Sequence, residues 1–465
     1  MSNAFSHPSL LFVALLAGAG PISAQTQTDP DVPAPTTLAQ TPPMGWNSWD
    51  SYGLTITEDQ FRANMRVLSD KLKPFGWTYA VIDEGWFLKN PQDRPRPELL
   101  QYEIDGYGRY IPVPARFPSA LSGAETNTGF AEIGREVHAL GLRFGIHIVR
   151  GVPRVSVHQN TPIEGSTFRA TEAADQTDAC PWDPTNWGVK DNAAGQAWYD
   201  ALIRQYAGWG VDLLKVDCIA DHPYRLSEIR QIRRAIDRSG RPMVLSLSPG
   251  PTSLSHAAEV GSLAQMWRIS NDIWDVWDSP APFPRTVKSQ FEPASAWAPS
   301  AHPGNWPDAD MLPVGELRPK PDVGPGPRKT RLSMDEQQTM LTLWAMARSP
   351  LILGANLTLL DDTTLHLLSN QGLLRIDQTA TASRQVLREG ALVVWTADLP
   401  DGKHAVAAFN LGDNPLLVTK DFPTLGLDPG KWQTRDLWQT RPELPLNAVT
   451  RTLAPHGCVL LELRR

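Results

Sequence analysis

Cysteines, metal-ligand clusters and long apolar runs are all scarce in this 465-residue sequence. Its three cysteines, Cys180, Cys218 and Cys458, allow at most one disulfide, which excludes a disulfide-rich scaffold. None of them lies in a C-x-x-C pair, and no histidine cluster has the spacing of metal ligands. The formal net charge of −7 argues against nucleic acid and against an anionic membrane surface as partners.

The most apolar run spans residues 10–19, which is too short for a transmembrane helix. Ser23 and Ala24 follow it and are small enough to suit cleavage before Gln25. The run therefore predicts a signal peptide over residues 1–24 and a secreted or periplasmic protein, although no Lys or Arg precedes it. Residues 25–40 are rich in Pro, Thr, Asp and Gln, which is typical of a flexible leader.

The chain, by contrast, is long and rich in tryptophan. A chain of 465 residues, 41% of them hydrophobic, is long enough for two domains with sizeable cores. The 17 tryptophans are a high count, and a flat indole with one N–H donor suits the apolar face of a sugar ring. Most of them are nevertheless expected in the core.

Short β-rich runs alternate with helical patterns over residues 41–377, an order that predicts parallel strands joined by crossover helices. Eight such units are typical of a (β/α)8 TIM barrel, in which the loops that follow the strands build the active face. The loops after Asp83 and Val149 are long, which is usual for functional loops. We expect strands at residues 43–47, 78–83, 143–149, 212–217, 243–248, 265–269, near 310–312 and 350–354. We expect helices at residues 57–72, 129–140, 195–209, 225–239 and 333–347.

The pattern changes after Asp377, where helical periodicity ends. Alternating runs at residues 386–397, 404–411, 416–422, 432–437 and 458–463 are separated by turn residues. Residues 378–465 are therefore predicted to form a C-terminal antiparallel β-sandwich.

Carboxylates follow several of the predicted barrel strands, where core strands would normally end in apolar residues. Asp83 and Glu84 follow the second strand, Asp217 ends the fourth, Asp272 follows the sixth, and Asp310 lies near the seventh. Glycoside hydrolysis needs two carboxyl groups, one to attack and one to protonate. Asp217 and Asp272 are the candidates for this pair.

Cations accompany both candidate carboxylates. Lys215 lies two residues before Asp217, on the same side of an extended strand, where its charge would lower the pKa of that carboxyl. Arg268 lies four residues before Asp272 and is placed to hold substrate or nucleophile oxygens. An apolar platform for a sugar is expected from Trp46, Trp49 and Trp86.

Six motifs in order resemble glycoside hydrolase family 27, the α-galactosidase and α-N-acetylgalactosaminidase family of clan D. They are Thr-Pro-Pro-Met-Gly-Trp-Asn-Ser-Trp at 41–49, Ile-Asp-Glu-Gly-Trp at 82–86, Leu-Lys-Val-Asp at 214–217, Trp-Arg at 267–268 with Asp272, and the segments 306–312 and 343–354. The resemblance implies a double displacement with retention of configuration and no metal or cofactor. It makes Asp217 the nucleophile and Asp272 the general acid/base. It places Trp49, Asp83, Glu84, Lys215 and Arg268 among the sugar-binding residues.

Three positions depart from the family pattern and bear on the sugar. Glu84 stands where the family usually has Asp, and its extra methylene points a carboxylate toward the C6 hydroxymethyl of galactose. His147 stands where Tyr is usual. Ser248 lies on the fifth strand, where α-galactosidases usually carry Cys-Glu-Trp, so the choice at the sugar 2-position stays open.

The family disulfide joins the loop after the third strand to a cysteine two residues beyond the nucleophile, whereas Cys218 lies one residue beyond Asp217. Two alternatives stay open: Cys180 pairs with Cys218, or Cys180 lines the pocket unpaired.

The resemblance implies a carbohydrate substrate, and the first expectation is an exo-acting α-galactosidase. β-L-Arabinopyranosidase, whose sugar lacks the C6 group, and α-N-acetylgalactosaminidase are the alternatives within the family. An endo-acting hydrolase and a non-catalytic sugar-binding barrel are more distant ones, and the presence of both carboxylates speaks against the latter. No oligomeric state is predicted.

Overall fold

The structure is a computed structural model that describes residues 38–93, 96–121, 126–318, 327–439 and 443–465. The predicted signal peptide and residues 25–37 of the predicted leader lie outside these residues. Within them, every helix is too short or too polar to cross a membrane.

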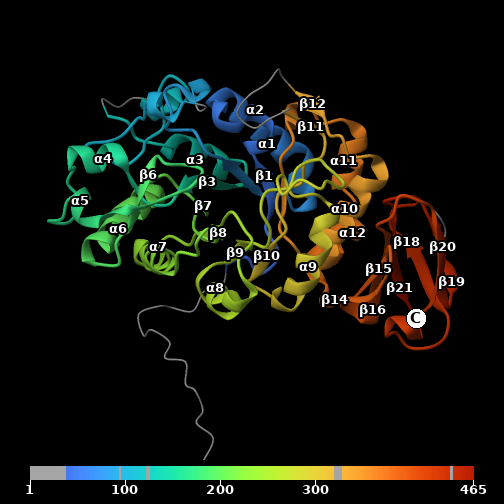
Figure 1. Ribbon diagram of the computed structural model, residues 1–465. Coiled ribbons are helices and arrows are strands. Elements are labelled where there is room, and N and C mark those ends of the chain that lie inside the picture. The colour runs from blue at the N-terminus through green and yellow to red at the C-terminus, as the bar shows by residue number, and fades with distance from the viewer. Residues whose placement is uncertain (1–37, 94–95, 122–125, 319–326, 440–442) are drawn as a thin grey trace, which may run out of the picture. The chain divides into compact units, whose positions relative to one another are not determined.

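Eight parallel strands form one sheet in the order β10-β9-β8-β7-β3-β2-β1-β13, with helices around it (Figure 1). A single parallel bridge between Leu312 and Leu353 joins the two ends of this order, and the Leu312 N–H donates to the Ile352 carbonyl at 2.8 Å. The predicted TIM barrel is confirmed. Its strands are β1 (Met44–Asn47), β2 (Tyr79–Ile82), β3 (Arg143–Val149), β7 (Leu213–Asp217), β8 (Val244–Leu247), β9 (Met266–Arg268), β10 (Trp306–Asp308) and β13 (Leu351–Leu353).

The seventh strand lies earlier than the expected position near residues 310–312. Its ladder with β9 covers Trp306–Asp308, and the chain then turns at Asp310, whose φ of 88° is incompatible with extended backbone. Only Leu312 pairs again, with β13. The expected segment is therefore the bridge that links β10 to β13 and not the ladder strand itself.

The predicted helices lie close to their expected places, and local caps explain where two of them begin. The Thr57 side chain accepts from the backbone of Gln60, and the Ser333 side chain accepts from the backbone of Glu336. The predicted helix 57–72 ends as an α-helix at Val67, and a π-helical turn continues it to Leu72. The helices on the barrel sequence include α2 (Glu58–Val67), α3 (Ala131–Ala139), α6 (Ala193–Gly208), α7 (Leu226–Ser239), α8 (Ala257–Leu263), α9 (Phe291–Trp297), α10 (Met334–Ala347), α11 (Asp362–Leu368) and α12 (Gln371–Thr379).

The long loop after β3 carries a small sheet of its own, in the order β4-β6-β5. β5 (Ala174–Ala179) leads directly to Cys180, and β6 (Asn186–Val189) leads toward α6. This sheet fixes the segment that lies over the end of β7. The other short elements are α1 (Trp49–Tyr52), α4 (Arg154–Gln159), α5 (Ala170–Ala173), β4 (Val152–Pro153), β11 (Glu316–Leu317) and β12 (Arg328–Lys329).

The C-terminal segment folds as the predicted antiparallel β-sandwich. A six-stranded sheet has the order β14-β15-β16-β21-β18-β19, and β17 pairs with β20. The expected single strand 386–397 is in fact a hairpin, because the chain turns at Gly390 (φ 57°) between β14 and β15. The strands are β14 (Thr381–Glu389), β15 (Leu392–Leu399), β16 (Lys403–Asn410), β17 (Leu416–Asp421), β18 (Trp432–Asp436), β19 (Leu444–Leu446), β20 (Ala448–Leu453) and β21 (Cys458–Arg464).

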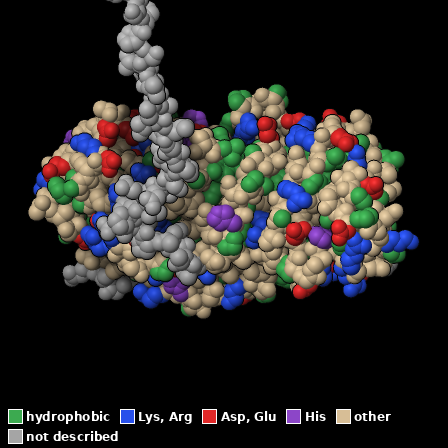
Figure 2. All heavy atoms as spheres, turned by 90° about the horizontal axis from the view of Figure 1, so that it is seen from below, with side chains coloured by type: hydrophobic (Ala, Val, Ile, Leu, Met, Phe, Trp, Pro, Cys, Tyr) green, Lys and Arg blue, Asp and Glu red, His purple; other side chains and the backbone are tan. Residues whose placement is uncertain are grey.

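Charges of both signs are mixed on the face shown in Figure 2, where Lys and Arg side chains alternate with Asp and Glu and with scattered apolar groups. The barrel interior, in contrast, is apolar. Apolar side chains inside it include Val81, Leu213 and Met266, whereas Trp77, Phe61 and Leu214 are fully buried in the core between the strands and the surrounding helices. Polar side chains gather instead where the barrel strands end.

Candidate active site

A pocket opens where the parallel strands end. The carboxyl ends of all eight barrel strands lie at one face, so side chains that are far apart in sequence meet there. The residues that line the pocket are Trp49, Asp50, Asp83, Glu84, His147, Trp182, Lys215, Asp217, Arg268, Asp272, Ile273, Trp274, Asp310 and Met311.

Asp217, the last residue of β7, has hydrogen-bond partners on both carboxylate oxygens. The His147 Nε2 and the Ser248 Oγ each lie 3.3 Å from Oδ2. The indole Nε1 of Trp182 donates to Oδ1 at 3.1 Å. These three partners come from β3, from the end of β8 and from the loop after β5, so the orientation of the carboxylate is set from three elements.

Positive charge near Asp217 favours its ionised form. Burial alone would raise its pKa, but the hydrogen bond and charge of His147 and the charge of Lys215 outweigh burial and hold the pKa below its usual value. Burial likewise acts to lower the pKa of His147, and the charge of Asp83 with the contact to Asp217 reverses this and raises it. A lowered pKa keeps Asp217 ionised, which is what a carboxylate nucleophile requires.

Asp83, directly after β2, forms a second polar centre deeper in the pocket. Its Oδ2 accepts from the Lys215 Nζ at 2.9 Å and from the Asn47 Nδ2 at 2.6 Å, and the Glu84 backbone N–H donates to its Oδ1 at 2.8 Å. Burial raises the pKa of Asp83, but the charges of Lys215 and His147 outweigh this and lower it. Lys215 therefore pairs directly with Asp83 and acts on Asp217 through its charge, which lowers the pKa of that carboxyl as expected from the sequence.

Asp272 lies on the other side of the pocket, beside Arg268. The Arg268 Nη2 is 3.2 Å from Asp272 Oδ1 and 2.7 Å from Asp310 Oδ2. The Asp272 side chain is 44% exposed, whereas those of Arg268 and Asp310 are buried. An exposed carboxyl at the pocket can exchange protons with solvent and with a leaving group, while a buried one cannot do so readily.

Most of the predicted site residues meet in this pocket. Ser248 does not line it but touches Asp217 from the neighbouring strand end. Cys180 also lies outside it: it is bonded to Cys218 with a Cα–Cα distance of 5.9 Å, so the alternative in which it lines the pocket unpaired is wrong. The pocket does contain the predicted Trp49, Asp83, Glu84, His147, Lys215, Asp217, Arg268 and Asp272.

Two of the three tryptophans expected to form a sugar platform are core residues. Trp46 and Trp86 are fully buried, and their indole N–H groups donate to the carbonyls of Ala355 and His147. Trp46 packs against Phe61 of α2 and Trp86 against Phe130 and Trp209, so of these three tryptophans Trp49 alone lines the pocket.

Three further residues, Trp182, Asp50 and Trp274, line the pocket but were not predicted from the sequence. Asp50 follows Trp49 directly, and Trp182 lies two residues after Cys180, so proximity to predicted site residues was the available signal. Burial and the charge of Asp310 raise the pKa of Asp50 well above its usual value. A neutral Asp50 would present a hydrogen-bond donor to the pocket.

Comparisons with known proteins agree with this architecture. A family model described as alpha galactosidase A matches residues 192–379. A second, described as the alpha galactosidase C-terminal beta sandwich domain, matches residues 389–463. The two models cover the second half of the barrel and the β-sandwich.

Individual relatives cover nearly the whole chain. A β-L-arabinopyranosidase of family 27 from Geobacillus stearothermophilus is 41% identical, with a TM-score of 0.84 over 92% of this chain and 97% of its own. An alpha-galactosidase from Cyamopsis tetragonoloba is 27% identical over 92% of this chain and 87% of its own. Alpha-galactosidase I from Mortierella vinacea shares the fold, with a TM-score of 0.69 at 23% identity over 92% of this chain and 97% of its own. The motifs, the fold and these matches together establish that the chain is a glycoside hydrolase and belongs to glycoside hydrolase family 27.

Proposed function

We propose that this protein is an exo-acting, retaining glycosidase that releases terminal β-L-arabinopyranose. Two observations support the sugar: Glu84 lines the pocket beside Asp83, and the 41% identical relative is a β-L-arabinopyranosidase. L-Arabinopyranose presents the same hydroxyl groups as galactose but lacks the C6 hydroxymethyl. A longer acidic side chain in that region fits the smaller sugar better.

The proposed reaction has two displacements at the anomeric carbon. The Asp217 carboxylate forms a bond to that carbon while the bond to the leaving oxygen breaks, and Asp272 gives its proton to that oxygen. Asp272 then takes a proton from water, whose oxygen displaces Asp217 and releases the sugar with its configuration retained. The different surroundings of the two carboxyls support this division of roles: His147 and Lys215 lower the pKa of Asp217, whereas Asp272, beside Arg268, is 44% exposed to solvent.

α-Galactosidase is the second candidate, because the 27% identical curated relative and the matching family models carry that activity in their descriptions. α-N-Acetylgalactosaminidase is the third, since Ser248 is smaller than the residues that α-galactosidases usually carry on this strand. A panel of matched nitrophenyl β-L-arabinopyranoside, α-D-galactoside and α-N-acetylgalactosaminide separates the three. The highest kcat/KM is expected for the arabinopyranoside, and a higher value for another member assigns that sugar instead.

Glu84→Asp is expected to raise the ratio of galactoside to arabinopyranoside kcat/KM. Shortening the side chain by one methylene withdraws the carboxylate from the region of the C6 hydroxymethyl, which removes a clash with galactose. The ratio should rise about tenfold if about 1.4 kcal/mol of transition-state contact is at stake. It is measured with the same aryl leaving group on both sugars, so that only the glycon differs.

Glu98→Asp makes the same chemical change at an exposed position outside the pocket and should leave the ratio at the wild-type value. If Glu84→Asp leaves the ratio unchanged or lowers it, Glu84 does not discriminate between sugars with and without the C6 group. The case for arabinopyranose would then rest on the similarity of the relative alone.

Export is also proposed. The signal-peptide pattern of residues 1–24 supports it, and so does the disulfide between Cys180 and Cys218, because disulfides persist mainly in oxidising compartments. Expression of the full chain in a Gram-negative host should yield periplasmic or extracellular protein whose N-terminal residue is Gln25. Cytoplasmic protein that keeps Met1 would contradict the proposal.

A further inference from the structure

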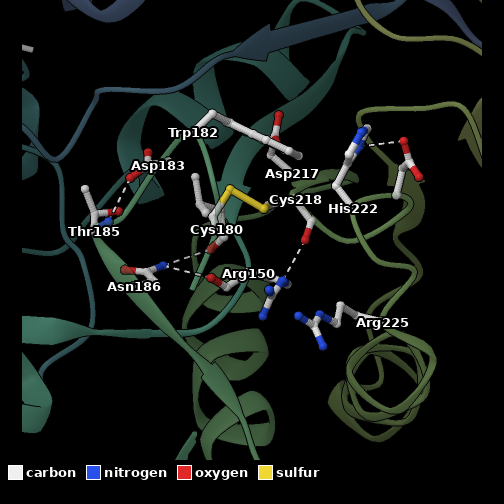
Figure 3. The surroundings of a disulfide bond; sticks show 12 residues. Arg150, Cys180, Trp182, Asp183, Thr185, Asn186, Asp217, Cys218, His222 and Arg225 are labelled. Carbon is white, nitrogen blue, oxygen red and sulfur yellow. Dashed lines mark hydrogen bonds and ion pairs between the residues drawn. A yellow bond between two sulfur atoms is a disulfide. The ribbon is translucent and has the colours of Figure 1, made fainter. Parts of the chain in front are cut away.

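Trp182 contacts the proposed nucleophile, although nothing in the sequence motifs assigns it a role. Its indole Nε1 donates to Asp217 Oδ1 at 3.1 Å, and Figure 3 shows its side chain extending toward Asp217. The residue is 40% exposed, so burial of the ring does not explain its position. Its ring meets the His222 ring edge-on, with centroids 5.9 Å apart, at the open side of the pocket.

The chain on both sides of Trp182 is fixed. Cys180, two residues before it, is bonded to Cys218, the residue that follows Asp217. Asp183, directly after it, is buried, and its Oδ1 accepts from the Thr185 N–H at 2.9 Å. The disulfide thus ties the segment that carries Trp182 to the end of β7, the strand that carries the nucleophile (Figure 3).

A buried guanidinium makes a second tie between the same two segments. The Arg150 Nε donates to the Cys218 carbonyl at 2.6 Å, and its Nη1 and Nη2 reach the Asp178 carboxylate at 2.9 and 3.0 Å. Asp178 lies on β5, two residues before Cys180, so Arg150 holds both partners of the disulfide in place. Cys218 has a φ of 62°, a left-handed conformation that cysteine rarely adopts without such support.

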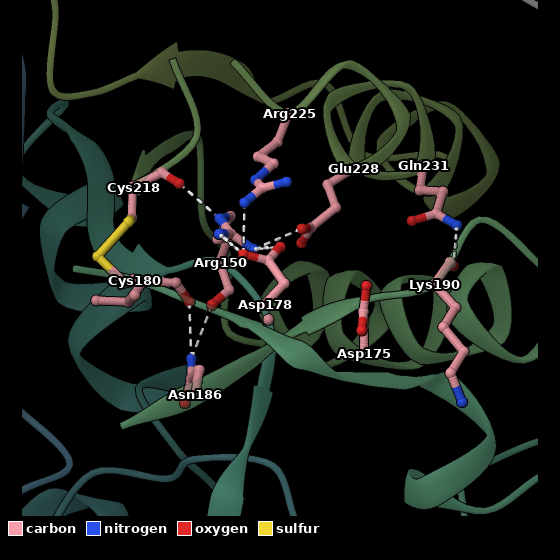
Figure 4. A network of polar contacts seen from close by, with 12 residues as sticks. Arg150, Asp175, Asp178, Cys180, Asn186, Lys190, Cys218, Arg225, Glu228 and Gln231 are labelled. Carbon is pink, nitrogen blue, oxygen red and sulfur yellow. Dashed lines mark hydrogen bonds and ion pairs between the residues drawn. A yellow bond between two sulfur atoms is a disulfide. The ribbon is translucent and has the colours of Figure 1, made fainter. Parts of the chain in front are cut away.

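Further charges complete this cluster, as Figure 4 shows. Arg150 Nη1 also lies 2.7 Å from Glu228 Oε1, and Arg225 Nη2 lies 2.5 Å from Asp178 Oδ1. Two guanidinium groups therefore face two carboxylates, and each carboxylate is paired. A balanced buried cluster of this kind holds its geometry firmly, because separating any member leaves a charge unpaired.

From these contacts we propose that Trp182 is a positioning residue for the nucleophile: its N–H sets the rotation of the Asp217 carboxylate, and the disulfide with the Arg150 cluster holds Trp182 in register. His147 and Ser248 lie near one oxygen only, so a donor on the other oxygen is needed to fix the plane of the carboxylate. The attack depends on that plane, since displacement requires an aligned oxygen close to the anomeric carbon. The inference rests on the proposed role of Asp217 and holds for either sugar.

Trp182→Phe removes the donor and keeps a flat aromatic ring. We expect kcat/KM to fall about tenfold, with the loss in kcat and not in KM, because orientation of the attacking group is lost while the sugar contacts remain. The acid limb of the kcat/KM–pH profile should also move up by about 0.5 to 1 pH unit, since a donor to the ionised carboxylate lowers its pKa. The substrate is whichever nitrophenyl glycoside of the panel is turned over best.

Two further variants control the test. Trp187→Phe makes the same chemical change on β6, outside the pocket, and should leave both the acid limb and kcat at wild-type values. His147→Gln removes the imidazole whose hydrogen bond and charge lower the pKa of Asp217, and it should move the acid limb in the same direction and further than Trp182→Phe. Shifts of the acid limb in this order would show that the limb follows the ionisation of Asp217.

The proposal is overturned if the acid limb of Trp182→Phe coincides with that of the wild type, or if kcat/KM falls only because KM rises. Either result is expected of a side chain that only shapes the pocket. The wild type is also labelled with an activated 2-deoxy-2-fluoro glycoside, and the labelled residue is identified by peptide mass spectrometry. This experiment tests the assignment of Asp217 separately from the role of Trp182. Label on Asp217 with an unaltered Trp182→Phe profile refutes the role of Trp182 alone. Label on another residue refutes the assignment of the nucleophile, and the role of Trp182 with it.

Discussion

Asp217→Ala is expected to lower kcat on the order of 10⁴-fold, the largest effect of any single substitution in this protein. Without the carboxylate no covalent glycosyl-enzyme can form, and the two easier displacements are replaced by one direct attack of water on the sugar. Folding should be retained, because Asp217 lies at the partly exposed end of β7 and its truncation opens space without burying a new charge. Steady-state rates on the best nitrophenyl glycoside and the circular dichroism spectrum of the variant test both statements.

Azide provides a sharper test of the same assignment. In Asp217→Ala it can occupy the place of the lost carboxylate, attack the anomeric carbon directly and give a glycosyl azide of inverted configuration. Asp191→Ala removes an exposed carboxylate outside the pocket and should show neither the loss nor the rescue. Near-normal turnover by Asp217→Ala without azide would mean that another residue is the nucleophile.

Asp272→Asn is expected to have the second largest effect, and one that depends on the leaving group. Substrates with poor leaving groups should lose on the order of 10³-fold in kcat/KM, because the departing oxygen is no longer protonated, whereas dinitrophenyl glycosides should lose far less. With these activated substrates the glycosyl-enzyme should form in a burst and then accumulate, since no base assists its hydrolysis. Pre-steady-state release of the phenol measures both phases.

Azide also distinguishes the two carboxyls. In Asp272→Asn it attacks the accumulated glycosyl-enzyme without needing a base, so the glycosyl azide keeps the configuration of the substrate. The two variants should therefore yield azides of opposite configuration. An equal loss on good and poor leaving groups would show that Asp272 is not the acid, and Arg268, which contacts it at 3.2 Å, would then hold a carboxylate with another role.

Local sequence patterns were sufficient to predict the fold class and the residues that carry the proposed chemistry. Strand and helix periodicities are local, so the eight units of the barrel were predicted within a few residues for seven strands out of eight. The active face follows from the same pattern, because in a parallel barrel every strand ends on one side. Asp83, Asp217 and Asp272 could be placed together for this reason before any distance was known.

How these side chains pair, in contrast, depends on contacts between segments that are distant in the sequence. Lys215 reaches Asp83, 132 positions away in sequence, in preference to Asp217 on its own strand. Trp182 meets Asp217 across 35 positions because a disulfide brings its loop back over β7. A local pattern encodes which way a side chain leaves its strand, but its partner depends on loop closure and on the rotamers of neighbouring strands. For the same reason Trp46 and Trp86, which look like Trp49 in the sequence, are buried, while Trp49 lines the pocket.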